Sequence, residues 1–376
     1  MLFTEKLQIT PQQPTIHGEV SAPVTDIQSL SPVDEAVYYS PGETPNPVVN
    51  RRLLDTDRHA RFGDSWTEIF TMKNGRRYEV VTNVPRKQRS EVPIVFTTAL
   101  GTSIRGHNWH TMQQMMDTGF SVVMVGPEGG HASWPHSKRG WKQFMHNLTN
   151  ISLEETAENM HEILNVTDHL YLYEPGGAIN IGESRGGGAG MGFKARASRF
   201  GRQVLYSDLT ATPFAKKLAL LESPKLSNVP VKELKSIGRV FLRGKVDLVR
   251  LTHYPETLNL NPHYLLHVAG SIPTLLRGHS GNLADEIGQD AKMHNTQFEE
   301  DGMGQASEWD EKFKHHPYVV NLLLAGTHVD LAQDWVLDAR VARMRGLRDE
   351  LETAKGQWAR IDWRNVHMGE HIVRAA

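Results

Sequence analysis

Apolar residues in this chain fall into short runs that are separated by stretches with helical periodicity. The runs have the length of β-strands and occupy residues 92–101, 120–130, 178–182, 202–208, 291–298 and 318–326. The stretches 110–119, 189–200 and 306–316 are typical of helices. Strands that alternate with helices predict an α/β fold, in which helices cover both faces of a mostly parallel sheet. We expect the most apolar run, 318–326, to be a buried strand.

Two further helices are predicted from single residues and their spacing. Ser152 stands three residues before Glu155, which is the spacing of a capping box, and an apolar stripe with helical period follows. A long helix is predicted from about 331 to 354. Its apolar face consists of Leu337, Val341, Met344, Leu347 and Leu351.

A β-hairpin is predicted near the start of the ordered chain. The β-rich runs 66–72 and 78–83 flank the pair Asn74-Gly75, which favours a tight turn with positive φ at both residues. Order is expected to begin near Trp66, because residues 1–63 carry many prolines and little periodicity. We interpret residues 1–63 as an N-terminal extension over the core.

The remaining chain divides by the character of its segments. Residues 64–211 are expected to form the first part of an α/β core, and residues 291–355 the second part. Residues 212–290 have helical patterns without a convincing strand alternation, so they are interpreted as a helical cap inserted over the sheet. Residues 356–376 are left as a C-terminal tail.

Composition excludes some classes of function but does not identify the function. The 376 residues are 39% hydrophobic and 22% charged, as in an ordinary globular protein. The formal net charge of −2 gives no electrostatic reason to expect a nucleic acid or an anionic membrane as partner. Cysteine is absent, which excludes disulfides, thiolate metal sites and a cysteine nucleophile. Neither a signal peptide nor a membrane span is visible, so a cytoplasmic location is expected.

The segment GESRG, residues 182–186, fits the pattern G-x-S-x-G between an expected strand and an expected helix. A strand that turns abruptly into a helix strains the backbone at the corner, and small residues two positions to either side avoid collisions. Ser184 is thereby raised above the sheet at a helix N-terminus, where free N–H groups favour a developing anion. The motif predicts that Ser184 is a nucleophile. The competing role is a simple helix N-cap.

With this motif the chain resembles the α/β-hydrolase superfamily, in its esterase-like and lipase-like members, over roughly residues 64–355. The resemblance implies a serine hydrolase that cleaves carboxylic esters through a Ser-His-Asp triad and an acyl-enzyme. The segment LGTSIRGHNW, residues 100–109, is similar to the oxyanion loop of the family but lacks its histidine. The backbone N–H groups of Thr102 and Arg185 are then the expected oxyanion donors.

The other two triad members are sought by their order along the chain. In the preferred assignment His328 follows the last core strand and acts as the base. Asp301 follows the preceding strand and acts as the acid, 27 residues before the histidine. That spacing accommodates one helix and one strand.

A second assignment places the acid and the base later in the chain. Asp330 is then the acid, residues 358–365 form the last strand, and the base is His367 or His371. This arrangement requires an unusually long helix between acid and base, and a last strand with three charged residues. Asp208 and Asp247 are minor alternatives for the acid.

Two rival functions come from other classes. Residues 190–195 fit G-x-G-x-x-A, and Asp208 follows after a strand, as in a dinucleotide-binding fingerprint. The glycines, however, fall inside the expected helix rather than at the strand exit. The second rival is a catalytically silent α/β-hydrolase that serves as a binding or structural module. His367 and His371 are one helical turn apart, but the sequence HMGEH lacks the Glu next to the first His that the zinc-protease motif requires, so neither a metal nor a cofactor is expected.

The expected partner is a small-molecule ester. The predicted cap is fairly apolar, as in HYLLHVAGSIPTLL at 263–276, which favours a substrate with an apolar portion. The Pro-rich residues 1–63 are compatible with a homo-oligomer, although no motif establishes one.

Overall fold

The structure is a computed structural model, and all the residues that it describes belong to the second of two units, Pro32–Ala376. The described residues are 46–59, 63–84, 92–97, 107–127, 152–171, 177–210, 280–298, 306–325, 334–354, 357, 360 and 361. The first part of the expected extension, most of the expected cap and most of the expected tail lie outside these ranges.

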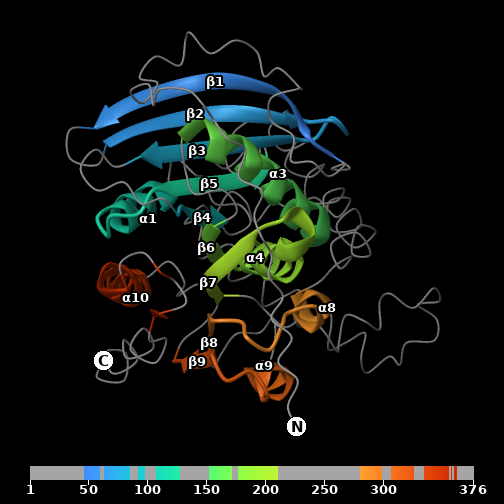
Figure 1. The fold of residues 1–376 in the computed structure, drawn as a ribbon, viewed down its shortest axis with the longest axis vertical. Coiled ribbons are helices and arrows are strands. Elements are labelled where there is room, and N and C mark those ends of the chain that lie inside the picture. The colour runs from blue at the N-terminus through green and yellow to red at the C-terminus, as the bar shows by residue number, and fades with distance from the viewer. Residues whose placement is uncertain are drawn as a thin grey trace, which may run out of the picture. The chain divides into compact units, whose positions relative to one another are not determined.

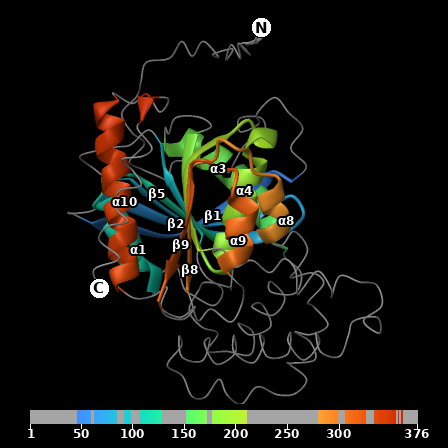
Figure 2. The same ribbon diagram turned by 90° about the horizontal axis from the view of Figure 1, so that it is seen from below.

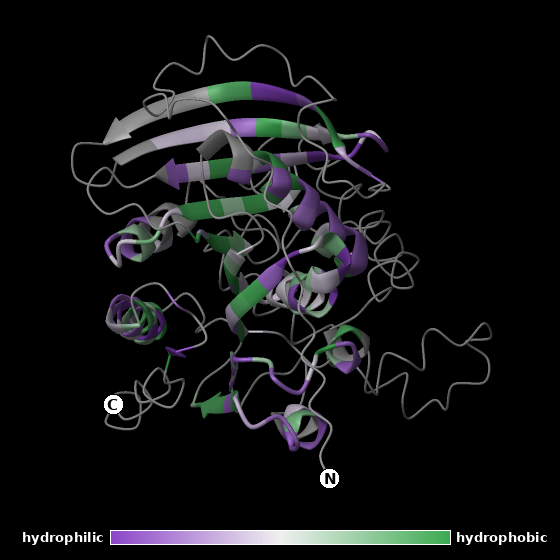
Figure 3. Cartoon of the chain, viewed as in Figure 1, coloured by the Kyte–Doolittle hydropathy of each residue, from purple (hydrophilic) through white to green (hydrophobic). Residues whose placement is uncertain are grey.

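Nine strands form one sheet in the order β1-β2-β3-β5-β4-β6-β7-β8-β9 (Figure 1). The strands are β1 Val48–His59, β2 Gly63–Met72, β3 Arg77–Val84, β4 Ile94–Thr97, β5 Val122–Pro127, β6 Gly177–Glu183, β7 Gln203–Thr210, β8 Met293–Phe298 and β9 Val319–Leu324. Pairing is antiparallel from β1 to β5 and parallel from β5 to β9. Hydrophobic residues follow the middle strands β5 and β4 (Figure 3), and every residue of β4 is buried.

Helices cover both faces of this sheet. They are α1 His107–Met116, α3 Leu153–Tyr171, α4 Arg185–Arg196, α8 Ser280–Asp285, α9 Ala306–Phe313 and α10 Asp334–Thr353, with the short 3-10 helix η3 at Ala197–Phe200. Helices α1 and α10 lie on one face, and α3, α4, α8 and α9 lie on the other (Figure 2). Each face has its own apolar core. The expected fold class, a mostly parallel sheet with helices on both faces, is therefore confirmed, whereas most of the expected cap lies outside the described residues. No helix in the described ranges is long and apolar enough to cross a membrane.

Strand β1 corrects the prediction that order begins near Trp66. This strand, Val48–His59, pairs with β2 from one end to the other. It lies within residues 1–63, the segment expected to be an extension. The pairing shifts register between Val48 and Asn50 and again between Leu53 and Asp55. Each shift interrupts the alternation of inward and outward side chains, so an edge strand with such irregularities shows no period of two in its sequence.

The predicted hairpin connects β2 to β3, but its turn differs from the expectation. Gly75 has φ of 81°, whereas Asn74 does not have positive φ. The N–H of Gly75 donates to the carbonyl of Met72 at 2.8 Å, and the N–H of Met72 donates to the carbonyl of Arg76 at 2.7 Å. The loop therefore has three residues, with glycine alone in the left-handed region, instead of the two-residue turn that the pair Asn-Gly favours.

The helix start at Ser152 and the long helix are present as predicted, but the burial of the last strand is not. Ser152 Oγ accepts the N–H of Glu155 at 3.0 Å at the start of α3. All five residues of the predicted apolar face of α10 are buried. Strand β9, by contrast, is only half-buried, and Leu323 is 52% exposed. Among the described strands β9 is the last of the sheet, so no described strand pairs with one of its edges.

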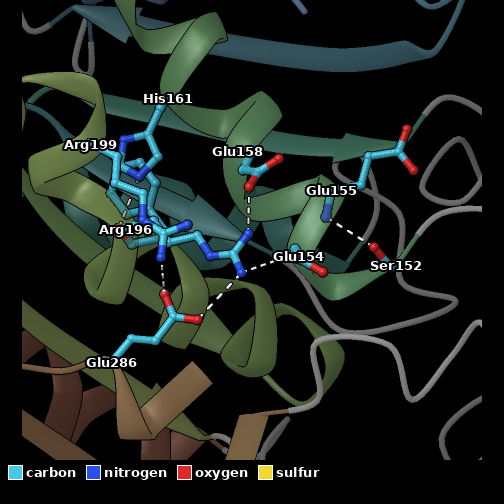
Figure 4. A network of polar contacts seen from close by, with 9 residues as sticks. Ser152, Glu154, Glu155, Glu158, His161, Arg196, Arg199 and Glu286 are labelled. Atoms are coloured by element: carbon cyan, nitrogen blue, oxygen red, sulfur yellow. Dashed lines mark hydrogen bonds and ion pairs between the residues drawn. The ribbon is translucent and has the colours of Figure 1, made fainter. Parts of the chain in front are cut away.

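An ion-pair cluster joins helices α3, α4 and the end of α8 (Figure 4). The guanidinium of Arg196, whose side chain is 6% exposed, contacts the carboxylates of Glu154, Glu158 and Glu286. Arg199 contacts Glu286 as well, but its side chain is 60% exposed. The cluster fixes the C-terminal end of helix α4. The candidate site lies at the N-terminal end of the same helix.

Candidate active site

Ser184 occupies the sharp turn between β6 and α4. Its backbone has φ of 54° and ψ of −118°, and it is the one non-glycine residue with positive φ in the described part of the chain. Such a conformation costs a residue with a β-carbon about 1–3 kcal/mol and persists only where the surrounding structure holds it. The strained corner expected from the motif GESRG is therefore present at the serine.

Backbone hydrogen bonds on both sides hold this corner. The N–H of Ser184 donates to the carbonyl of Thr210 on β7 at 2.9 Å, and the N–H of Gly188 donates to the carbonyl of Ser184 at 3.0 Å. Ser184 stands at the N-cap position of α4, yet its side chain makes no capping hydrogen bond. This observation argues against the simple N-cap role. The first N–H groups of α4 have no partner within the helix and point toward this corner.

The glycines around Ser184 allow close packing. A β-carbon on Gly182 would lie 2.5 Å from the carbonyl oxygen of Gly186, which is inside van der Waals contact. Farther along α4, a β-carbon on Gly190 would lie 2.7 Å from Leu209 Cδ2, and one on Gly192 would lie 2.9 Å from Leu283 Cδ1. These glycines bring α4 close to β7 and α8.

Glycine packing also bears on the dinucleotide interpretation. Gly190 and Gly192 lie inside α4 and face protein neighbours, so they form no phosphate-binding loop at a strand exit. Asp208 is fully buried, and its carboxylate contacts Arg340 Nε at 3.2 Å and Arg343 Nε at 2.7 Å. Both carboxylate oxygens of Asp208 are thus engaged by arginines, which argues against both roles considered for Asp208.

The buried charge of Asp208 is stabilised by its two partners. Burial by itself would raise the pKa of Asp208, but the guanidinium groups of Arg343 and Arg340 outweigh burial and lower the pKa to about 2. Burial, together with the negative charge of Asp208, raises the pKa of Tyr206 well above its ordinary value. The hydroxyl of Tyr206 lies 2.5 Å from His294 Nδ1 on β8. A polar network thus runs under the carboxyl end of the sheet between β6 and β8.

Sequence reasoning considered only Asp208 among the members of this network and missed the others, of which Arg340 makes the most contacts. Arg340 Nη1 contacts Glu183 Oε1 at 2.6 Å, and Arg340 Nη2 contacts Thr210 Oγ1 at 3.2 Å. Glu183 is the residue directly before Ser184. The available signal was the position of Arg340 within the apolar stripe of α10, between Leu337 and Met344, where a charged residue needs a buried partner.

The direction in which successive strands are added to the sheet reverses at β4, beside the carboxyl end of β6. After β4 the chain continues to β5 on one side and later returns to β6 on the other, which makes this a topological switch point. Thr97 at the end of β4 pairs with Gly182 of β6. The carboxyl end of β4 therefore lies beside the Ser184 turn. The ends of β8 and β9 lie at the same edge, where Phe298 pairs with Leu324.

The predicted site residues are only partly covered by the structure. Ser184 is at the expected turn, and Arg185 begins α4, with its N–H at the helix N-terminus. The remaining predicted residues of the site lie outside the described residues, and these are Thr102, Asp247, Asp301, His328, Asp330, His367 and His371. No group of three or more His, Asp or Glu side chains that could hold a metal ion occurs within the described ranges.

Comparisons with known proteins give likenesses of architecture. No protein-family model matches the chain, and no curated protein matches it. An esterase of Pyrococcus furiosus, Pf2001, has a TM-score of 0.49 at 10% identity, over 80% of this chain and 98% of its own. A thermostable carboxyl esterase from Bacillus coagulans has a TM-score of 0.49 at 15% identity, over 76% of this chain and 99% of its own. Acetyl xylan esterase 1 from Thermoanaerobacterium sp. JW/SL YS485 has a TM-score of 0.44 at 13% identity, over 77% and 87%. At such identities the likenesses do not extend to activity or substrate.

Proposed function

We propose that this protein is a serine hydrolase that cleaves carboxylic esters, with Ser184 as the nucleophile. The observation that carries the proposal is the strained backbone conformation of Ser184, which has φ of 54° and ψ of −118°. This residue lies between a parallel strand and a helix. Serine gains nothing from this strain as an N-cap, because its side chain makes no capping bond. A strained turn that raises a hydroxyl above the sheet is what nucleophilic attack requires.

The reaction proceeds by acyl transfer. Ser184 Oγ attacks the ester carbonyl while His328 takes its proton, and His328 then donates that proton to the leaving alcohol. Asp301 orients the imidazole and stabilises its charged form. The backbone N–H groups of Thr102 and Arg185 stabilise the negative oxygen of the tetrahedral intermediate. Water repeats the sequence on the acyl-enzyme and releases the acid.

Chain connectivity supports this set of residues. Asp301 comes three residues after the end of β8, and His328 four residues after the end of β9. With neighbouring strands about 4.8 Å apart, these ends lie about 10 Å and 14 Å from the end of β6, a span that short loops bridge. Thr102 follows β4, the strand paired with β6.

The competing triad receives less support. It requires residues 358–365 to be the last strand, yet Arg360 and Ile361, the two residues of this run in the described part of the chain, are not in a strand. Helix α10 directly follows the chain that leaves β9, as the assignment with His328 requires.

The substrate class follows from the expected cap. We assign residues 212–290 to a helical cap whose apolar residues accept the acyl or alcohol portion of an ester. The structure describes residues 280–290 of this segment, and there helix α8, Ser280–Asp285, packs against α4 as part of the core. The substrate is therefore a small ester with an apolar portion.

Active-site labelling tests the proposal. Folded protein is treated with a fluorophosphonate probe, the labelled peptide is identified, and turnover of short aryl esters is measured in parallel. We expect the label on Ser184, and we expect Ser184→Ala to lose both label and turnover. Folded protein that takes no label would refute the proposal and favour the catalytically silent module.

The two triads are separated by their histidines. His328→Ala is expected to lower ester turnover by several orders of magnitude, as removal of a triad member does. His367→Ala and His371→Ala serve as matched controls and are expected to retain turnover. If His328→Ala stays active and either control loses turnover, the catalytic base is His367 or His371 in the C-terminal tail, and the assignment of His328 is wrong.

A further inference from the structure

Arg340 lies beneath the turn that carries Ser184. Its side chain is 1% exposed, and it extends from α10 to two adjacent strands of the sheet. Nη1 contacts Glu183 Oε1 at 2.6 Å, Nη2 contacts Thr210 Oγ1 at 3.2 Å, and Nε contacts Asp208 Oδ1 at 3.2 Å. One planar group therefore binds the end of β6 and the end of β7 together.

Two of these acceptors flank the hydrogen bond that holds the strained serine. The N–H of Ser184 donates to the carbonyl oxygen of Thr210 at 2.9 Å. Glu183 is covalently joined to the donor residue, and the hydroxyl of Thr210 belongs to the acceptor residue. Arg340 thus holds the two residues whose separation sets the length of the Ser184–Thr210 bond.

The network has two positive and two negative side chains, and Arg340 is the one that pairs most closely with Glu183. Two guanidinium groups, of Arg340 and Arg343, face two carboxylates, of Glu183 and Asp208. Arg343 binds Asp208 at 2.7 Å, a shorter contact than the 3.2 Å of Arg340. The shortest contact of Arg340 is with Glu183, at 2.6 Å. Only the fork of a guanidinium supplies donors in several fixed directions, which a lysine cannot do.

We propose that Arg340 is a positioning residue for the nucleophile, which acts by holding Glu183 and Thr210 so that Ser184 stays in its strained conformation. This inference rests on the proposed role of Ser184 as the nucleophile. Arg340 contacts no reacting atom and acts only through the backbone at Ser184. Helix α10 and the Ser184 turn are consequently coupled, although 156 residues separate Ser184 from Arg340 in the sequence.

Arg343 provides the matched control. It lies on the same helix, is almost fully buried, and pairs with the same carboxylate. Its partners are Asp208 and Tyr206, and neither flanks the Ser184–Thr210 bond. If Arg340 only attached α10 to the sheet, loss of either guanidinium would have the same effect on the serine.

The experiment compares Arg340→Lys, Glu183→Gln and Arg343→Lys in the full chain. The readouts are the rate of fluorophosphonate labelling at Ser184, kcat and KM for an aryl ester, the thermal midpoint, and amide hydrogen exchange in a peptide that covers the turn. We expect Arg340→Lys to slow labelling and kcat by about 10²-fold with KM nearly unchanged, because a misplacement of about 1 Å can cost that much. We expect Glu183→Gln to act in the same direction, more weakly. Both variants should speed exchange at the turn.

For Arg343→Lys we expect a lowered thermal midpoint but labelling within about threefold of the wild type, since its contacts do not reach the turn. Equal slowing in Arg340→Lys and Arg343→Lys, or labelling of Glu183→Gln at the wild-type rate, would overturn the proposal. Glu183→Gln decides the question if Arg340→Lys does not fold. If the wild-type protein takes no label, the proposed role of Ser184 as nucleophile is refuted instead. Hydrogen exchange at the turn would then still show whether Arg340 holds the backbone of Ser184.

Discussion

A β-carbon placed on Gly182 would lie 2.5 Å from the carbonyl oxygen of Gly186, and only 2.9 Å from Gly187 Cα. Both obstacles are backbone atoms, which cannot rotate away as a side chain can. Gly182→Ala must therefore push the start of α4 away from the end of β6, and this moves Ser184, which lies between them. We expect a loss of about 1–3 kcal/mol in the free energy of unfolding, as is typical of overpacking. Labelling of Ser184 should slow by about 10²-fold.

Gly346 is the control for this substitution. It lies inside α10, and a β-carbon there would meet no atom within 4 Å. Alanine is about 0.8–1.0 kcal/mol more favourable than glycine in a helix interior, so Gly346→Ala should raise the free energy of unfolding by about that amount. Urea unfolding measures both variants. A stabilised Gly182→Ala would contradict the packing argument.

Removal of the Asp208 carboxylate should be among the most damaging single changes in the described part of the sheet. Asp208 is fully buried between Arg340 and Arg343, and Asp208→Asn leaves these two cations without a charged partner at that position. Breaking a buried pair in this way costs about 3–5 kcal/mol. Asp338, exposed on α10, is the control, and Asp338→Asn should change the free energy of unfolding by less than about 0.5 kcal/mol. Chemical denaturation at neutral pH compares the two, and similar effects would contradict the role of the network.

The cluster at the C-terminal end of α4 permits a comparison of two arginines that share a carboxylate. Arg196 is 6% exposed and contacts three carboxylates, whereas Arg199 is 60% exposed and contacts Glu286 alone. Arg196→Ala removes the buried cation that three acids share, leaves Glu286 with the exposed Arg199 alone, and should cost about 2 kcal/mol. Arg199→Ala should cost at most about 0.5 kcal/mol, as exposed pairs do. Thermal unfolding at low and high salt distinguishes them, and an equal loss in both would refute the importance of burial.

The features predicted correctly from the sequence are those specified by neighbouring residues. The turn at Ser184 depends on Gly182 and Gly186, two positions to either side, and the start of α3 depends on Ser152 and Glu155, three positions apart. The apolar face of α10 follows from a period that a single helix displays by itself. In each case the physical cause lies within one or two turns of chain.

The features that the sequence did not reveal depend on distant segments. Arg340 is buried because Glu183 and Asp208, from two strands far earlier in the chain, surround it. Strand β1 contains charged residues and two register shifts, and it is ordered by pairing with β2 rather than by its own pattern. Leu323 is exposed because β9 is at the edge of the sheet, which depends on the order of all nine strands. Such properties are absent from any local window of sequence.

The dependence of stability on pH should reveal a buried neutral histidine. His161 of α3 is fully buried and stacks between Phe193 and Phe200, with centroid distances of 4.1 Å and 4.6 Å. Its Nε2 lies 2.9 Å from the carbonyl oxygen of Phe193, to which a neutral ring donates its proton. Burial lowers the pKa of His161 well below its ordinary value, and the charge of Arg202 lowers it further.

The sign of the effect follows from where the proton binds. Below about pH 6.5 the unfolded chain takes up a proton on His161 that the folded chain does not, so the unfolded state gains stability there. Below about pH 6.5, this proton uptake should lower the free energy of unfolding by up to about 1.4 kcal/mol for each unit that the pH falls. His161→Gln keeps an N–H donor for Phe193 but cannot be protonated. Urea unfolding from pH 8 to pH 5 should therefore show a smaller slope in the variant below pH 6.5 and parallel curves above pH 7. Identical slopes over the whole range would mean that His161 takes up its proton at the same pH in the folded and the unfolded protein, which would contradict its burial in a neutral form.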